Sequence, residues 1–92
     1  ALSLKDASLS RCICHEVSFE DADLTRADCT FTDFTGSRFL HTNLTEADFT
    51  GAEGYAISPS LNTLKKTKFS LPEAMSLLHA LDILLTDPQP QD

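Results

Sequence analysis

The chain has 92 residues, of which 23% are charged and 41% hydrophobic, and its formal net charge at pH 7 is −7. This length suits one small domain with a narrow core. No stretch approaches the ~20 consecutive apolar residues of a membrane-spanning helix, and no basic segment precedes an apolar run as in a secretory signal. The acidic balance argues against nucleic acid or an anionic membrane as a direct partner.

From Leu2 to Leu71 the sequence repeats with a period of five residues. The first place of each unit is small or apolar, the third is usually Leu, Phe or Cys, and the other places are mostly polar. This period matches neither the helical spacing of apolar side chains, about 3.6, nor the alternation of a free strand. It fits a short extended segment, whose first and third side chains share one face, followed by a corner that turns the chain.

Four such sides would close one turn, so that each residue i would stack on residue i+20. The third places then form the core, and the same phase puts Leu64 beneath Leu44, Phe69 beneath Phe49 and Ile57 beneath Ser37. Gly54 and Pro59 fall at third places, so two sides of the last turn are expected to be irregular. The predicted third-place core consists of Leu4, Leu9, Cys14, Phe19, Leu24, Cys29, Phe34, Phe39, Leu44, Phe49, Leu64 and Phe69.

The units A-D-L-T-R, A-D-C-T-F and A-D-F-T-G (residues 22–31 and 47–51) resemble those of the pentapeptide-repeat family. The resemblance is to small bacterial members and, more distantly, to quinolone-resistance pentapeptide proteins. It implies an all-β fold, a right-handed quadrilateral parallel β-helix. Residues 1–71 would form about 3.5 coils, and strands stacked ~4.8 Å apart make this part about 17 Å long.

Repeat arrays need caps at their open ends. Because the sequence starts directly in the repeat, we expect a fragment of a longer repeat protein, a processed form or one half of an oligomer. At the other end, Ser70 and Glu73 form a capping-box pattern, which predicts a helix over residues 72–85. Residues 86–92 are predicted to be a disordered tail.

An apolar stripe on the predicted helix is formed by Ala74, Leu77, Leu78 and Leu81, at i, i+3, i+4, i+7 spacing. A β-helix ends in an apolar cross-section with unpaired strand edges, which the helix is expected to cover. The alternative is that the stripe also forms a homodimer, because the apolar surface exceeds what one contact uses. Quinolone-resistance relatives pair through their C-terminal ends, so the resemblance implies the same contact.

The cysteines Cys12, Cys14 and Cys29 all fall at inward places, and their odd number favours a reducing, cytoplasmic setting. The Cys12-x-Cys14-His15 motif could suggest zinc, but His15 points outward in this phase and the ligands do not converge. The three histidines lie far apart, with no predicted nucleophile beside them. We therefore expect no enzyme, metal or cofactor.

Acidic side chains form the more informative surface pattern. Asp28 and Asp48 stack on one side of the coil, and Asp33 and Glu53 on the next. The structural interpretation is that Asp at the second place solvates the coil and caps its corners. The functional interpretation is a non-catalytic scaffold that presents a rigid acidic surface to a protein partner. Phe31 and Tyr55, expected to point outward, are candidate partner contacts.

A sharper alternative comes from the resemblance, which implies a DNA mimic that binds a type II topoisomerase (gyrase) and bears on quinolone resistance. A coil of about 17 Å covers only roughly half a turn of duplex at 3.4 Å per step. Mimicry would therefore need a dimer or a longer parent chain.

Overall fold

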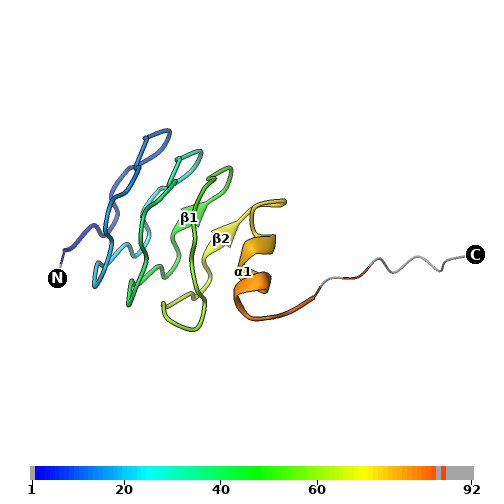
Figure 1. The fold of residues 1–92 in the computed structure, drawn as a ribbon. Helices are drawn as coiled ribbons and strands as arrows, with labels where there is room; N and C mark the ends of the chain where they lie inside the picture. The colour runs from blue at the N-terminus through cyan, green and yellow to red at the C-terminus, as the bar shows by residue number, and fades with distance from the viewer. Residues whose placement is uncertain (1, 85, 87–92) are drawn as a thin grey trace, which may run out of the picture.

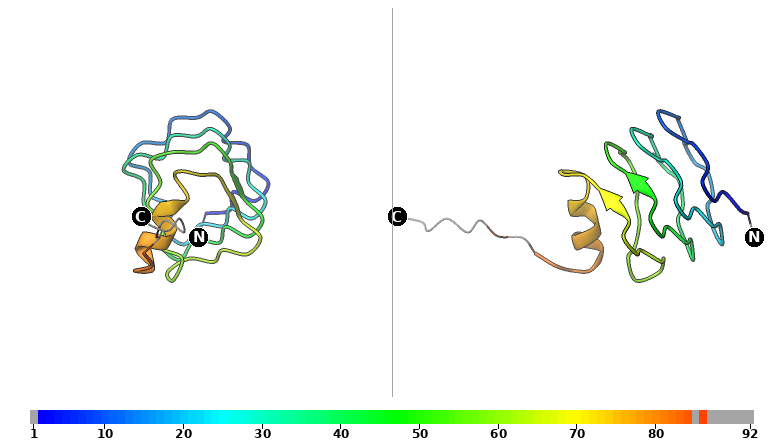
Figure 2. Two further views of the ribbon diagram at one scale, coloured as in Figure 1. Left: turned by 90° about the vertical axis from the view of Figure 1, so that its right-hand side faces the viewer. Right: turned by 180° about the vertical axis from the view of Figure 1, so that it is seen from behind.

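The protein forms a stack of coils with a short helix at its C-terminal end (Figure 1). This computed structural model describes residues 2–84 and 86. Its regular elements, in chain order, are strand β1 (Asp48–Phe49), strand β2 (Lys68–Phe69) and helix α1 (Met75–Ala80). Seen nearly along the stack, the coils have a four-sided outline (Figure 2). No helix in this part of the chain is long and apolar enough to cross a membrane.

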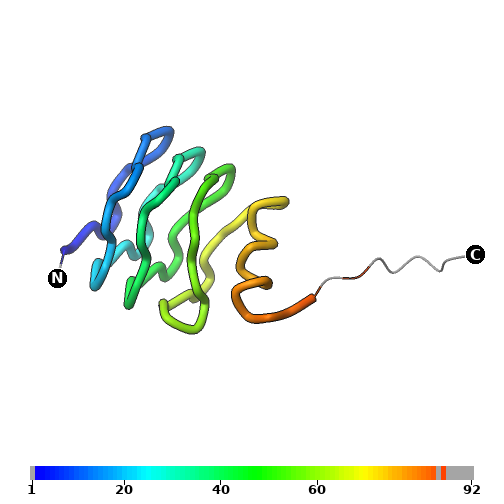
Figure 3. Tube along the Cα trace, viewed as in Figure 1, coloured from blue at the N-terminus to red at the C-terminus, as the bar shows by residue number. Residues whose placement is uncertain are grey.

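The coils are held together by parallel pairing between successive turns. Strands β1 and β2 pair in parallel, with Asp48 opposite Lys68 and Phe49 opposite Phe69. Single parallel bridges such as Ser3 to Asp23 and Asp28 to Asp48 continue the same pairing along the stack. All but one of these bridges join residues i and i+20, which confirms that Phe69 lies beneath Phe49. The path of the chain through the coils can be followed in Figure 3.

Each corner is a tight turn whose backbone explains the five-residue period. The amide of Ala7 donates a hydrogen bond to the carbonyl of Leu4, and Asp6 between them has a φ of 59°. A positive φ at the third of the four turn residues is typical of a type II turn. The same conformation recurs every five residues at Asp6, Arg11, Glu16, Asp21, Arg26, Phe31, Gly36, His41, Glu46 and Gly51.

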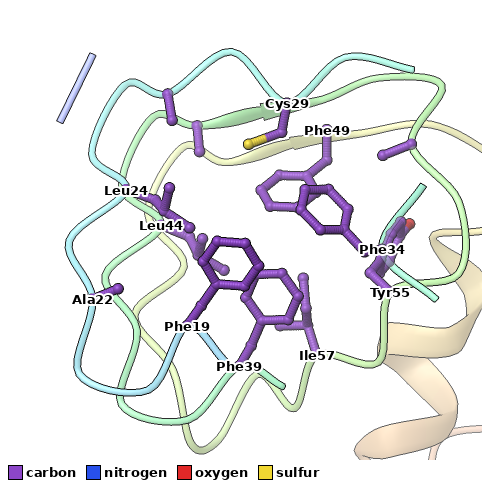
Figure 4. Packing of buried hydrophobic residues seen from close by; sticks show 13 residues of the cluster. Phe19, Ala22, Leu24, Cys29, Phe34, Phe39, Leu44, Phe49, Tyr55 and Ile57 are labelled. Atoms are coloured by element: carbon purple, nitrogen blue, oxygen red, sulfur yellow. The ribbon is translucent and has the colours of Figure 1, made fainter. Parts of the chain in front are cut away.

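The core is a column of third-place side chains, dominated by stacked aromatic rings (Figure 4). Ring centroids are 5.0 Å apart for Phe19 and Phe39 and 5.3 Å for Phe34 and Phe49. The middle coils bury their third-place residues, namely Phe19, Leu24, Cys29, Phe34, Phe39, Leu44 and Phe49, whereas Leu4, Leu9, Cys14, Leu64 and Phe69 in the end coils are partly buried.

Hydroxyl groups at first places are hydrogen-bonded, both where the side chain is buried, as in Thr42 and Ser37, and where it is half-buried, as in Thr67. Thr42 donates to the carbonyl oxygen of Phe19 at 2.6 Å, and Thr67 donates to that of Leu44 at 2.7 Å. Ser37 makes the same contact with Cys14. A buried hydroxyl without a partner would be costly, so these bonds let polar first-place residues replace alanine.

The last turn departs from the expected phase, as Figure 4 shows for Tyr55 and Ile57. Ile57 is buried and bridges to Phe39, so the expectation that it lies beneath Ser37 is wrong. Gly54, with a φ of 73°, turns the chain early, and a Cβ there would lie 2.5 Å from the Thr35 hydroxyl oxygen. Tyr55 therefore enters the core in place of the third-place residue.

The loop that follows Ile57 restores the register. The amide of Leu61 donates to the carbonyl of Ser58, and the carbonyl of Leu61 accepts from the amide of His41. Ile57 thus pairs with the residue at i−18, Phe39, whereas Leu61 pairs with the residue at i−20, His41. The loop around Pro59 absorbs this difference.

Helix α1 is shorter than the predicted helix over residues 72–85, and the capping-box prediction is wrong. The N-cap residue of α1 is Ala74, which precedes the helix and makes no side-chain cap bond. The Ser70 hydroxyl instead accepts a hydrogen bond from the amide of Gly51 at 2.8 Å, so it is used by the coil. Residues 85 and 87–92, which include most of the predicted tail, lie outside the described residues.

The apolar stripe of the predicted helix only partly contacts the coil. Ala74, Leu77 and Leu78 are half-buried, Leu77 packs against the core cluster, and Leu81 is exposed. In Figures 1 and 2 helix α1 lies against the last coil. Leu81 follows the end of the helix, which explains why it leaves the stripe.

Candidate protein-binding surface

The four predicted acids form two stacked pairs on adjoining sides of the coil. Asp28 bridges in parallel to Asp48, and Asp33 bridges to Glu53. The corner between the two sides carries Phe31 in one coil and Gly51 in the next. We call Asp28, Asp33, Asp48 and Glu53 the acidic surface.

Each aspartate of this surface also has a structural role. Oδ1 of Asp28 accepts hydrogen bonds from the amide and the hydroxyl of Thr30, at 3.1 and 2.7 Å. These bonds lower the pKa of Asp28, the hydroxyl bond contributing most. Asp33 accepts the same two bonds from Thr35, and Asp48 accepts the amide of Thr50 alone. The structural interpretation, in which the acids cap the corners, thus accounts for one oxygen of each aspartate.

Within residues 2–84 and 86, Asp28, Asp48 and Glu53 lack the ion pairs that four other acids of the coil make, as do Glu16 and Glu46. Asp6, Asp23, Glu20 and Asp21 lie within ionic contact of Arg26, Lys5, Arg38 and His41. Among the described residues, no cation forms such a contact with Asp28, Asp48 or Glu53. The second oxygens of these aspartates accept no hydrogen bond from the described residues. Within the described part of the chain these three acids therefore form no direct ion pair, and Lys68 is the cation that stands opposite Asp48 in the next coil.

Asp33 is the member of the surface with a histidine neighbour. Its Oδ2 lies 2.6 Å from Nε2 of His15, one coil away. This contact is the main reason that the pKa of Asp33 falls to about 2, and its hydrogen bonds from Thr35 lower it further. From the sequence, His15 is considered only for metal binding and catalysis, although the phase of the repeat places its coil next to that of Asp33.

The two aromatic candidates have different environments. Phe31 is 54% exposed, as expected for a partner contact. Tyr55 is buried, so the expectation that it points outward is wrong. Its hydroxyl group is buried with no hydrogen-bond partner among the described residues. Burial, with a smaller effect from the charge of Glu73, raises the pKa of Tyr55 to about 12.

The cysteines only partly follow the prediction that all three point inward. Cys29 is buried, and its burial raises its pKa to about 12. Cys14 is half-buried, but Cys12 is exposed. Cys12 lies in the first described coil, where the described residues stack on one side only. The equivalent Thr32, one coil further, is completely buried.

Within the described residues, no group of three His, Cys, Asp or Glu side chains is placed to hold a metal ion. The imidazoles of His15 and His41 face carboxylates rather than hydroxyl or thiol groups. The geometry therefore offers a charged surface for binding and no arrangement that we can assign to a reaction.

A family model of pentapeptide repeats matches residues 3–39 and 26–53, with 8 copies of the repeat. These matches cover more than half of the chain, which therefore belongs to the pentapeptide-repeat family and has its β-helix fold. No curated protein matches the chain at a significant level.

Solved structures with the same fold include QnrB1, a plasmid-mediated fluoroquinolone resistance protein. The TM-score is 0.59 at 19% identity, over 88% of this chain and 43% of QnrB1. A pentapeptide repeat protein from the Arabidopsis thaliana thylakoid lumen gives 0.35 at 28% identity, over 71% of this chain and 46% of that one. The chain thus spans less than half the length of both proteins. At this identity the similarity to QnrB1 shows the fold alone.

Proposed function

We propose that this protein is a non-catalytic scaffold whose acidic surface binds a protein partner. The observation that carries the proposal is that Asp28, Asp48 and Glu53 stand together on adjoining sides of the coil and form no ion pair within the described residues, whereas Asp6, Asp23 and Glu20 are paired with cations. A partner that supplies lysine or arginine would complete these contacts. Such charge complementarity favours specific and rapid association.

Rigidity supports the same function. The aspartates are fixed by bonds to the residue two positions on, and their backbone is fixed by pairing to the next coil. Carboxylates held in this way lose little conformational entropy when a partner binds. We also propose that the β-helix is right-handed and that α1 caps its C-terminal end. The protein would work in the cytoplasm.

The chain itself offers a substitution that separates charge from structure. Asn43 occupies a second place and, through Oδ1, accepts the same two bonds from Thr45, at 3.1 and 2.6 Å. Asp28→Asn with Asp48→Asn should therefore keep the corner bonds and remove two charges. Asp23→Asn is the matched control, because Asp23 has the same cap but is paired with Lys5.

The test is capture of proteins from a bacterial lysate on three immobilised baits: the wild type, the Asp28→Asn, Asp48→Asn double variant and the Asp23→Asn control. We expect the same partner on the wild type and the control, less on the double variant, and less on all three at high salt. Equal capture by all three baits would contradict the proposal.

The alternative function is a DNA mimic that binds a type II topoisomerase, with an effect on quinolone resistance. Its support is the fold shared with QnrB1, together with the stacked carboxylates of the acidic surface. We expect addition of the protein to change gyrase supercoiling or its inhibition by a quinolone. No change in either would leave the scaffold function alone.

Solution mass tests the same alternative independently. The described coil is short, so a mimic would need a homodimer, formed through the C-terminal end, or a longer parent chain. A monomer at high concentration would count against mimicry by this chain, while leaving the scaffold function intact.

A further inference from the structure

Phe31 is an exception among the corner residues. Every other non-glycine residue with a positive φ in the described chain is charged or histidine, whereas Phe31 has a φ of 55° and is 54% exposed. A left-handed backbone is unfavourable for a bulky residue. About half of the ring stays in water, so burial offsets only part of this cost.

The ring is held in place from both neighbouring coils. The guanidinium carbon of Arg11 lies 4.8 Å from the ring centroid, a cation–π contact. On the other side the ring covers Gly51, where a Cβ would lie only 2.4 Å from Cδ1 of Phe31. The backbone amide of Phe31 is also fixed, by a bond to the carbonyl of Thr50. A ring held in this way is preorganised for contact with a partner.

Charges on both sides of this corner restrict what can cover the ring. Asp28 and Asp48 lie on the side before Phe31, and Asp33 and Glu53 on the side after it. Two cations, Arg11 against the ring and Lys68 opposite Asp48, are outnumbered by these four acids. The balance disfavours an acidic segment or nucleic acid. A second copy of this chain, whose formal charge is −7, would be disfavoured for the same reason.

We propose that Phe31 is the aromatic anchor of a docking site for a basic, amphipathic protein segment. An apolar side chain of the segment covers the exposed part of the ring, and its lysines or arginines pair with Asp28, Asp48 and Glu53. The inference rests on the proposed function and adds to it the chemistry of the partner. Anchors of this kind are typically aromatic residues surrounded by a polar rim.

The test uses three fluorescent peptides of equal length and measures their binding to the full chain by anisotropy. One peptide alternates lysine with leucine, the second alternates glutamate with leucine, and the third alternates lysine with serine. We expect the lysine–leucine peptide to bind at least about tenfold more tightly than either of the others. Similar affinities for all three would overturn the proposal, as would no binding of the first.

Variants then assign the contact to the corner. Phe31→Asn removes the ring with a residue that tolerates a left-handed backbone, and Phe31→Tyr restores an aromatic. Leu61→Asn is the matched control, because Leu61 is also exposed, at 50%, in the loop of the last turn. We expect Phe31→Asn to weaken binding about tenfold, and Phe31→Tyr and Leu61→Asn to leave it nearly unchanged. Equal losses from Phe31→Asn and Leu61→Asn would contradict the anchor.

Two further measurements identify other occupants. A dimer that dissociates in the Phe31→Asn variant would assign the corner to a second copy, and binding of a DNA duplex probe would assign it to nucleic acid; either result overturns the inference. The proposed function fails separately, if lysate capture does not depend on Asp28 and Asp48. If capture depends on those charges but not on Phe31, only the anchor is wrong.

Discussion

The regular coils (residues 22–51) and the last turn (residues 52–71) solve the same packing problem in different ways. In the regular coils the third place points inward on every side, as Leu24, Phe34 and Phe49 do. In the last turn Gly54 holds a third place, and Tyr55 and Ile57 fill the core instead. The space left by the preceding coil therefore decides which side chain enters the core. In most units this is the third place of the five-residue repeat, but in the last turn it is not.

The columns along the stack show a second difference. Leu9, Cys29 and Phe49 share one column, yet Leu9 is partly buried and the other two are fully buried. Leu4, Leu9 and Cys14, which have a described coil on one side only, are all partly buried, although Phe19 at the end of the same coil is buried. Position in the stack matters as much as residue type.

The largest expected effect comes from placing a charge in a regular coil. Phe34→Asp removes a fully buried ring, at a cost of about 3–5 kcal/mol, and buries a carboxylate without a partner. Because domains of this size are stable by only about 5–15 kcal/mol, we expect the variant to be unfolded. Circular dichroism on heating should show no cooperative transition.

The control for this variant is Phe31→Asp, the same substitution at an exposed corner. It should keep a cooperative transition. An unchanged melting temperature for Phe34→Asp would mean that the third place does not point inward.

The next effect tests whether the irregular turn is as well packed as the regular coils. Ile57→Ala should lower the free energy of unfolding by about 2–5 kcal/mol, because Ile57 is 3% exposed. Leu61→Ala, in the same turn, should change it by less than about 0.5 kcal/mol, since Leu61 is exposed. Urea unfolding measures both. Equal costs would place Ile57 outside the core.

A smaller effect concerns the corner beneath Phe31. Gly51→Ala should cost about 1 kcal/mol for the left-handed backbone, since Gly51 has a φ of 74°, and more for displacing the Phe31 ring. In the Phe31→Asn background only the backbone cost should remain. A double-mutant cycle by urea unfolding gives the difference. Strictly additive costs would show that the ring does not lie against Gly51.

The sequence predicts the regular part of the fold because one physical rule applies there repeatedly. Stacked coils with the same register give each third-place side chain the same neighbours, so the pairing of Phe49 with Phe69 follows from the repeat alone. The repeat fails as a guide at Ile57, because Gly54 turns the chain early and the loop at Pro59 then adds residues back. Glycine can adopt several turn conformations. The sequence alone does not show which of them packs against the preceding coil.

The candidate surface was predictable in position but not in environment. The phase places Asp28 above Asp48, as the structure does. It does not show which acids are paired with cations, since that depends on side chains reaching across coils, as His15 reaches Asp33. Nor could it show that Ser70 accepts a bond from Gly51 rather than beginning the helix. A capping pattern considers only residues that are close in sequence. Here the Ser70 hydroxyl bonds to the preceding coil instead of to the start of the helix.

The smallest expected effect has the opposite sign and concerns Tyr55, whose hydroxyl is buried without a partner among the described residues. Tyr55→Phe keeps the ring contacts with Phe49 and Phe69 and removes the unpaired hydroxyl. We expect it to be neutral or to stabilise the protein by up to about 1 kcal/mol near neutral pH.

The same substitution has a pH dependence that identifies its cause. Burial raises the pKa of Tyr55 to about 12, whereas in the unfolded chain it is about 10. Between these values the unfolded state loses the proton first, so the stability from this group is present below about pH 10 and lost as the pH rises towards about 12. The advantage of Tyr55→Phe over the wild type should therefore widen in urea unfolding above about pH 10. Because Cys29 is common to both proteins, its own ionisation cancels in the comparison. A difference that stays constant with pH would show that the Tyr55 hydroxyl reaches water.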